Sequence, residues 1–216
     1  MAWNSNRLAH RTKGHVLLIV LTGIDGAGKT TAARAVVDAA RASGKQACLL
    51  RNPAGRLAMA SMWKRLGIRP ALRVEECLES SARIWNVLIN TVRARRRCGL
   101  VLMDRGLVCQ LALRQMRGLP RGRVIPWLLS VLPQPDAVVH FELEPALALE
   151  RIDQRAADTE TLQGLTAFQA GYASLPEYAT FTVLDASRPQ ASVQADLAAI
   201  AGRGSGCDPK PLPARF

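Results

Sequence analysis

Short apolar runs alternate with longer amphipathic segments along most of the chain. Five runs have the length of β-strands, and their almost continuous apolar character is typical of strands that are buried on both faces. They cover residues 15–22, 46–51, 99–104, 136–143 and 181–185. The segments between them have helical character and predict helices over residues 28–43, 72–97, 107–115, 124–132, 145–157, 161–175 and 189–201.

This alternation is the pattern of βαβ units, which build parallel sheets. We therefore predict an α/β fold in three layers, with about five parallel strands covered by helices on both faces. Residues 15–201 should form the folded domain. Residues 1–14 are polar and basic and predict a flexible leader, and residues 202–216 are rich in Gly and Pro and predict a flexible tail.

Charge and cysteine content indicate the binding partners and the cellular compartment of the protein. It carries 29 Lys and Arg against 17 Asp and Glu, an excess that attracts polyanions such as nucleotides. The densest basic run is Arg93, Arg95, Arg96 and Arg97, but positive charge is favoured at the end of a helix, so nucleic acid is not the expected partner. The five cysteines have no Cys-x-x-Cys spacing, and the longest apolar run, 16–21, is too short to cross a bilayer. We expect a cytoplasmic protein without disulfides, zinc or membrane insertion.

The strongest motif follows the first predicted strand directly. Residues 23–30 read Gly-Ile-Asp-Gly-Ala-Gly-Lys-Thr, a full Walker A match in its strand–loop–helix setting. Glycines let the backbone N–H groups surround phosphate oxygens, Lys29 would neutralise the β and γ phosphates, and the Thr30 hydroxyl would bind Mg²⁺. The predicted ligands are ATP and Mg²⁺, and the predicted binding residues are Gly23, Asp25, Gly26, Ala27, Gly28, Lys29, Thr30 and Thr31.

A second candidate group ends the third predicted strand. Asp104 and Arg105 would lie at the carboxyl edge of the sheet, where ligands bind in open α/β folds. Asp104 could bind Mg²⁺ or orient the acceptor, and Arg105 could hold a phosphate with two parallel hydrogen bonds. The same two residues could instead form an ordinary ion pair at the end of a strand, with no role in ligand binding.

With these motifs in order, the chain resembles the thymidylate kinase family of nucleoside monophosphate kinases from about Val16 to Ile200. Residues 21–31 match the opening strand and P-loop of that family. Residues 51–55, Arg-Asn-Pro-Ala-Gly, stand in place of its Arg-Glu-Pro-Gly-Gly segment, and residues 104–106, Asp-Arg-Gly, in place of its Asp-Arg-Tyr. Residues 135–143 resemble its Pro-Asp strand, and 145–151 the helix that follows.

The resemblance implies a phosphotransferase that moves the γ-phosphoryl group of ATP to a nucleoside monophosphate, with thymidine monophosphate (dTMP) as the leading acceptor. It places Asp25 near the acceptor sugar and implies a homodimer. Arg51, Arg83 and Arg105 would bind the acceptor, and a lid would supply Arg151 and Arg155, which could equally form a solvated helix face. The implied catalytic residues are Lys29, Asp104, Arg105 and Arg155.

Departures from the family pattern fall on the acceptor side. Glu79 stands where the family has a base-stacking Phe, Asn52 replaces an acidic residue, and Gly106 replaces Tyr. The lid's Asp-Arg pair reads Asp-Thr at 158–159. We therefore expect ATP use to be retained and the acceptor pocket to have diverged. Trp63 and Trp85 are candidate replacements for the aromatic surface, although aromatic residues at helical spacing usually belong to the core.

Two other functions fit the same motifs. The chain could phosphorylate another small hydroxyl compound, such as a nucleoside or a sugar-like metabolite, with Asp104 as the base. It could also be a nucleotide-binding module without kinase activity. Switch and motor NTPases need a water-positioning residue, and the sequence has no evident candidate. Arg51 and Arg105 favour a phosphorylated acceptor because they give its phosphate two binding partners.

Overall fold

The computed structural model of this chain describes residues 16–52, 72–97, 99–155 and 160–203. Its centre is a five-stranded sheet in which every pair of neighbours is parallel, in the order β2-β3-β1-β4-β5. The strands are β1 (Val16–Thr22), β2 (Ala47–Arg51), β3 (Gly99–Asp104), β4 (Ala137–Glu142) and β5 (Thr182–Asp185). The strand order reverses beside β1, which makes the loop after β1 the expected ligand site.

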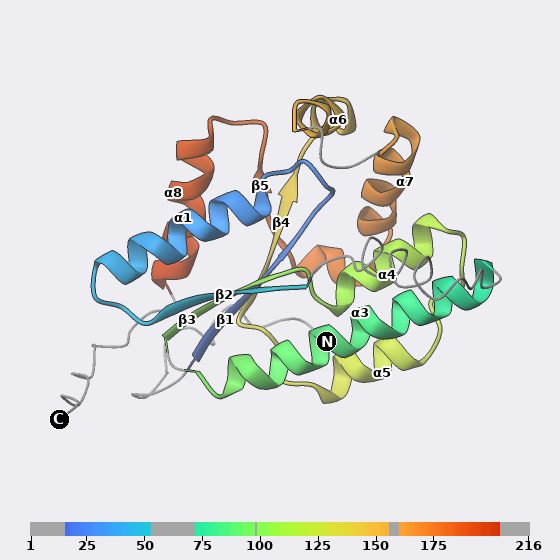
Figure 1. Ribbon diagram of the computed structural model, residues 1–216, viewed down its shortest axis with the longest axis horizontal. Coiled ribbons are helices and arrows are strands. Elements are labelled where there is room, and N and C mark those ends of the chain that lie inside the picture. The colour runs from blue at the N-terminus through green and yellow to red at the C-terminus, as the bar shows by residue number, and fades with distance from the viewer. Residues whose placement is uncertain (1–15, 53–71, 98, 156–159, 204–216) are drawn as a thin grey trace, which may run out of the picture.

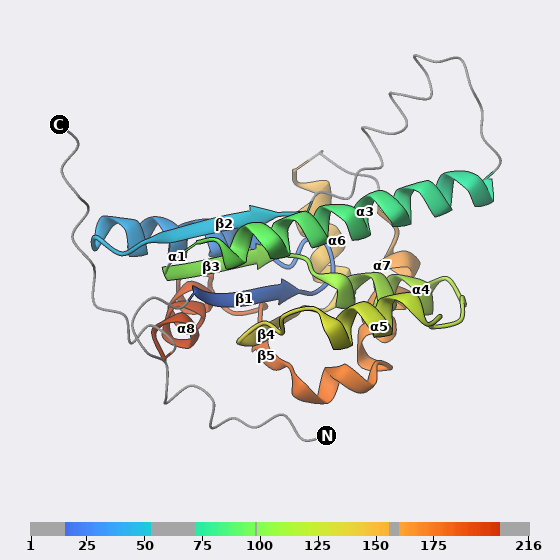
Figure 2. The same ribbon diagram turned by 90° about the horizontal axis from the view of Figure 1, so that it is seen from below.

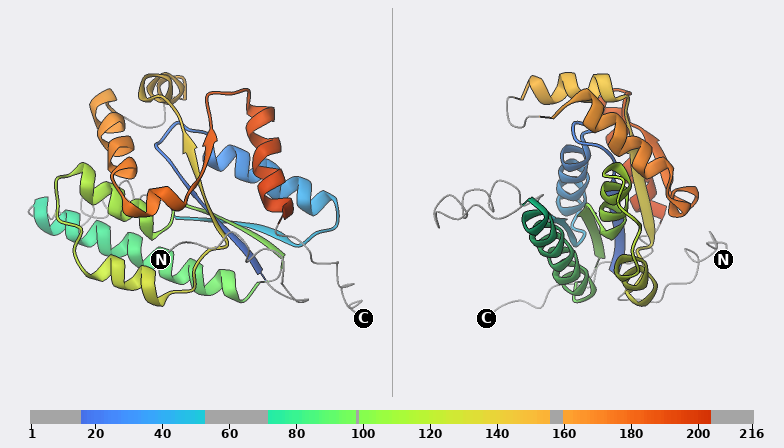
Figure 3. Two further views of the ribbon diagram at one scale, coloured as in Figure 1. Left: turned by 180° about the vertical axis from the view of Figure 1, so that it is seen from behind. Right: turned by 90° about the vertical axis from the view of Figure 1, so that its right-hand side faces the viewer.

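Helices cover both faces of this sheet and complete the predicted three layers. On one face lie α1 (Lys29–Ala42) and α8 (Gln190–Arg203), and on the other lie α3 (Leu72–Arg95), α4 (Leu107–Met116) and α5 (Val124–Val131) (Figure 1, Figure 3). Two more helices, α6 (Pro145–Asp153) and α7 (Leu162–Ala173), stand beyond the carboxyl ends of the strands. Figure 2 shows β1, β2 and β3 pointing toward that side of the molecule.

Burial follows the position of each strand in the sheet. Every residue of the central β1 is buried, as a strand covered on both faces should be. The prediction of two buried faces is wrong for the edge strand β5, where only Leu184 is buried. An edge strand has a neighbour on one side alone, so side chains such as Val183 reach solvent.

The predicted elements agree with the structure except at a few ends. The helix predicted over 145–157 ends at Asp153 and gives way to a turn at 154–155. Helix α8 continues through Gly202 and Arg203, which were predicted to begin the tail. A 3-10 helix over Pro176–Thr180 was not predicted. The predicted leader 1–14 and residues 204–216 lie outside the described residues, so the division into leader, domain and tail stays a prediction.

None of the helices among the described residues combines the length and the apolar character that crossing a bilayer requires. The longest of them, α3, ends in a basic turn that contains Arg93 and Arg95. The predicted arginine run therefore lies at a helix C-terminus, where positive charge interacts favourably with the helix dipole.

A buried histidine joins the sheet to the helices at its carboxyl edge. His140 of β4 is 1% exposed, and its Nδ1 lies 3.1 Å from the Thr22 hydroxyl at the end of β1. Its ring packs edge-on against Tyr172 of α7 and Tyr178 of the 3-10 helix. Burial, with a smaller contribution from the charge of Lys29, lowers the pKa of His140 from 6.5 to about 4. The imidazole is therefore neutral in the folded protein at neutral pH.

This pKa predicts a loss of stability in mild acid. Below pH 6.5 the unfolded chain takes up a proton that folded His140 accepts only near pH 4, so the free energy of unfolding falls as the pH drops through this window. Between pH 7.5 and 5.5 the loss should be about 1 kcal/mol, or roughly 3 °C in Tm. Thermal unfolding of the wild type and of His140→Gln at both pH values measures it. An equally large shift in the variant would contradict the assignment.

Candidate active site

The loop after β1 has the backbone of an anion cradle. Gly23, Gly26 and Gly28 all have positive φ, a conformation that a Cβ atom disfavours. A Cβ on Gly23 would also lie 2.5 Å from the carbonyl oxygen of Phe141, so only glycine fits there. The loop leads into α1, whose first turn contains no acidic residue. The N–H groups and the positive end of the helix dipole are therefore available to a phosphate.

Lys29 lies deep beneath this loop. Its ammonium donates a hydrogen bond to the carbonyl oxygen of Ile24 at 2.6 Å, and the residue is 5% exposed. Burial lowers the pKa of Lys29 from its ordinary value, the Arg105 guanidinium lowers it further, and Asp25 and Asp104 raise it. A buried cation in this position gains stability from any anion that enters the loop.

Thr30 and Asp104 meet across the junction of α1 and β3. The Thr30 hydroxyl donates a hydrogen bond to Oδ2 of Asp104, whereas Oδ1 of Asp104 is buried and has no hydrogen-bond partner among the described residues. A buried carboxylate oxygen without a partner indicates a place for a ligand. A hydroxyl and a carboxylate are hard oxygen donors, which suit Mg²⁺, an ion that usually takes its other ligands from water and phosphate.

Arg105, the residue after β3, combines a strained backbone with an ion pair. Its φ is 71°, the only positive value at a non-glycine position among the described residues, and this left-handed conformation costs about 1–2 kcal/mol. Its guanidinium donates to the Asp25 carboxylate. Burial is the largest influence on the pKa of Arg105 and acts to lower it, but Asp25 together with Tyr172, Cys109 and Asp104 outweighs burial and holds the pKa above its ordinary value. A permanent cation therefore faces the P-loop.

Two hollows meet at this ion pair. The P-loop hollow lies over the cradle and is lined by residues 25–26 and 28–31, Asp104, Arg105, Ile152 and Arg155. The α4 hollow lies between α3, α4 and α7, and its polar side chains are Asp25, Asn52, Arg83, Arg105, Gln110, Arg117 and Glu160. Asp25 and Arg105 line both hollows. One hollow can therefore hold a triphosphate while the other holds a second substrate next to it.

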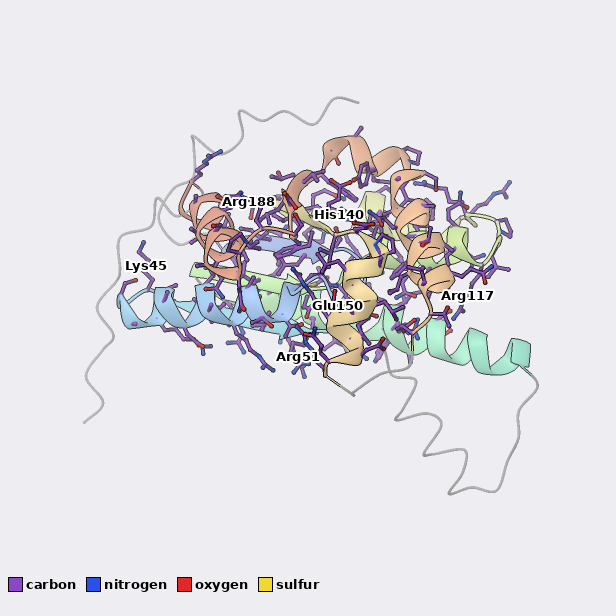
Figure 4. All side chains as sticks on the ribbon, turned by 90° about the horizontal axis from the view of Figure 1, so that it is seen from above. Lys45, Arg51, Arg117, His140, Glu150 and Arg188 are labelled. Atoms are coloured by element: carbon purple, nitrogen blue, oxygen red, sulfur yellow. The ribbon has the colours of Figure 1, made fainter. Side chains whose placement is uncertain are left out.

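Most of the predicted site residues gather around these hollows. The residues predicted to bind ATP and Mg²⁺ form the cradle, where the Ala27 side chain is buried, and Arg155 reaches the P-loop hollow from the turn after α6. Arg83 of α3 lines the α4 hollow. Arg51 is exposed and lines neither hollow, and the view from above shows it apart from Arg117, on the other side of α6 (Figure 4).

Other candidates are placed elsewhere. Nη1 of Arg151 donates to the carbonyl oxygen of Ala186 at 3.1 Å, and Arg151 lines neither hollow. Trp85 is 64% exposed, so it belongs neither to the core nor to the α4 hollow. Trp63, residues 158–159 and the side chain of Glu79 lie outside the described residues.

Several residues of the α4 hollow were missed by sequence reasoning. Five of them come from α4 and the residue that caps it, and Phe168 and Gly164 come from α7. The α4 residues lie on one face of the helix, as an adjacent pair on each side of Leu113 at a distance of three and four positions, and are Cys109, Gln110, Leu113, Met116 and Arg117. This spacing was visible in the sequence, but an apolar helix face usually predicts core packing.

Fold and cradle together define a P-loop phosphotransferase, and comparison with known proteins identifies its family. Residues 21–197 match the family model described as thymidylate kinase. The chain is 31% identical over 205 residues to a thymidylate kinase of Deinococcus radiodurans, covering 87% of this chain and 98% of that protein. It is 27% identical over 186 residues to a probable thymidylate kinase of Archaeoglobus fulgidus, covering 84% and 92%. The chain belongs to the thymidylate kinase family.

The cradle predicts the result of removing its lysine. Lys29→Ala should lower kcat for ATP-dependent phosphoryl transfer by about a hundredfold or more, because one preorganised positive charge on the transferring group is lost. The comparison is Lys45→Ala, which removes an exposed lysine from the loop after α1. Steady-state ADP release and circular dichroism measure activity and folding. A folded Lys29→Ala variant with the turnover of Lys45→Ala would overturn the cradle assignment.

Proposed function

We propose that this chain is an ATP-dependent kinase that phosphorylates dTMP. An oxygen of the dTMP phosphate attacks the γ-phosphorus of ATP, the bond from that phosphorus to the ADP oxygen breaks, and thymidine diphosphate and ADP leave. The observation that carries this proposal is the pair of hollows that meet at Asp25 and Arg105. Membership of the thymidylate kinase family supports both the reaction and the acceptor.

On the ATP side, the N–H groups of the loop and Lys29 bind the β and γ phosphates. Thr30 and the Asp104 oxygen that has no partner among the described residues would hold Mg²⁺, which when bound would offset the negative charge on the phosphates. Arg155, from the turn after α6, reaches the same hollow and adds positive charge near the transferring group. Stabilisation of charge in a site that excludes water is the main contribution a protein makes to phosphoryl transfer.

On the acceptor side, the charges favour a phosphorylated substrate. Arg83, Arg105 and Arg117 line the α4 hollow, and guanidinium groups match phosphate oxygens in geometry and charge. In the competing function Asp104 acts as a base toward a hydroxyl acceptor. However, Asp104 lines the P-loop hollow, and one of its oxygens accepts from Thr30. Asp104 is therefore better placed for a metal ion than for the acceptor.

The cysteines bear on the compartment in which the enzyme works. Cys48 and Cys109 are buried free thiols, which suits a reducing compartment such as the cytoplasm. The bound partners are ATP, Mg²⁺ and dTMP, and we propose no role for nucleic acid.

The acceptor is tested with a panel of nucleoside monophosphates, nucleosides and sugars in a coupled ADP-release assay. We expect dTMP to raise turnover furthest above background. Arg105→Ala should raise KM for dTMP roughly 10- to 100-fold, since a charged hydrogen bond to its phosphate is lost, and should change KM for ATP much less. Arg34→Ala, on the exposed face of α1, is the control. Activity on an unphosphorylated acceptor alone would rule out the proposal.

The homodimer implied by the family also has a candidate surface. Large apolar side chains are exposed on α3 and α5, the outer layer that Figure 2 views from below. Their spacing of three, four or seven residues puts those of each helix on one side, and two are tryptophans, which are enriched in interfaces. They are Trp85, Val92, Val124, Trp127 and Val131. We propose that a second copy of the chain covers this face.

Trp127→Glu should convert the dimer to a monomer, because it places a charge in the centre of an apolar contact. Leu162→Glu, at the start of α7, introduces the same charge at another exposed apolar position and should leave the dimer intact. Size-exclusion chromatography with light scattering gives both masses. A monomeric wild type, or a Trp127→Glu variant that stays dimeric, would refute the surface.

A further inference from the structure

Two asparagines are buried where β2, β3 and α3 meet. Asn52 follows β2, Asn90 lies in the last third of α3, and each is 7% exposed. Nδ2 of Asn90 donates to Oδ1 of Asn52 at 2.8 Å and to the carbonyl oxygen of Arg51 at 3.2 Å. Nδ2 of Asn52 donates to the carbonyl oxygen of Arg105 at 2.6 Å. A chain of side-chain hydrogen bonds therefore runs from α3 to the residue that separates the two hollows.

The donor and acceptor roles in this series of hydrogen bonds are determined by the groups at its ends. The backbone carbonyl of Arg105 can only accept, so Asn52 must present its NH₂ group there and its oxygen to Asn90. Asn90 must then present its own NH₂ group, which also reaches the carbonyl of Arg51. Neither asparagine can be replaced by a carboxylate without placing two acceptor oxygens against each other in a buried site.

Arg105, where this series of hydrogen bonds ends, needs the support that the asparagines give. Arg105 holds a left-handed backbone with φ of 71°, which is unfavourable for a residue with a side chain. Its N–H donates to the carbonyl oxygen of Leu21 at 3.0 Å, and its carbonyl accepts from Asn52. Both polar groups of this strained peptide segment are therefore bound, one by β1 and the other by the asparagine pair. Strained residues persist only where their surroundings determine the conformation.

We propose that Asn90, acting through Asn52, is a positioning residue that keeps Arg105 in its left-handed conformation and so directs the guanidinium into the space between the hollows. The proposal deepens the proposed function and rests on it for the identity of the acceptor. Asn90 itself lines neither hollow, whereas Asn52 lines the α4 hollow and Arg105 lines both, so Asn90 acts on the acceptor through other residues. The alternative role is structural, in which the pair only fastens α3 to the sheet.

The kinetic test separates these roles through the two Michaelis constants. Asn90→Ala should raise KM for dTMP about tenfold and leave KM for ATP within about twofold. The reason is that a displaced Arg105 guanidinium weakens binding of the acceptor more than binding of ATP. In an Arg105→Ala background the same change should raise KM for dTMP no further, since its target is absent. Asn86→Ala removes an asparagine one turn earlier on α3 and should change neither constant. Equal effects of Asn90→Ala in both backgrounds would overturn the proposal.

A second test uses unfolding and does not depend on activity. Arg105→Ala keeps the strained φ with a side chain, whereas Arg105→Gly relieves it. Without the asparagine pair, an alanine at position 105 can leave the left-handed region and recover its strain, which offsets part of the lost hydrogen bonding, whereas glycine has no strain to recover. Asn90→Ala should therefore lower Tm by about 3 °C less in the alanine background than in the glycine background. Equal losses of Tm in the two backgrounds would mean that the asparagine pair does not hold this conformation, and would contradict the proposal. A wild type that fails to phosphorylate dTMP would instead refute the proposed function, and the unfolding comparison would still decide the role of Asn90.

Discussion

The pairing of β3 with β1 is the constraint on which the rest of the site depends. Their register sets Leu21 opposite Asp104, so the carboxylate that ends β3 stands beside the loop that follows β1. The pairing of β2 with β3 then sets Arg51 opposite Asp104 and brings Asn52 within reach of Arg105. A slip of one residue would turn each of these side chains to the other face of the sheet and leave the cradle without its acidic partner.

This arrangement concentrates charge in a small and mostly buried volume. Lys29 and Arg105 supply two cations, and Asp25 and Asp104 supply two carboxylates. Only one pair is fully engaged, since Arg105 contacts Asp25 while one oxygen of Asp104 has no partner among the described residues. In the proposed function, an entering nucleotide with its metal ion would provide an anion for Lys29 and a cation for Asp104. Some buried charges of the site therefore lack a partner of opposite charge until the substrates bind, which favours the substrates over water.

The departures from the family pattern become easier to interpret in the structure. Asn52, in place of an acidic residue, belongs to a buried amide network that includes Asn90, so the two positions depend on each other. Gly106, in place of a tyrosine, lies so close to β1 that an added Cβ would be 2.8 Å from Cγ1 of Val20. Both substitutions therefore have local reasons in the packing of the carboxyl edge, and neither touches the phosphate cradle.

The order of elements, the parallel sheet and the cradle were all predictable from the sequence, because they depend on local patterns. Strand-length apolar runs, helical periodicity and a contiguous eight-residue motif each act over a short stretch of chain. The α4 hollow, the exposure of Trp85, the position of Arg51 outside both hollows and the Asn90–Asn52–Arg105 chain were not predictable. They depend on which residues distant in sequence become neighbours, and on which face each helix turns to the sheet. Tertiary packing alone decides that, since a hydrogen bond between residues 38 positions apart leaves no periodic signal in the sequence.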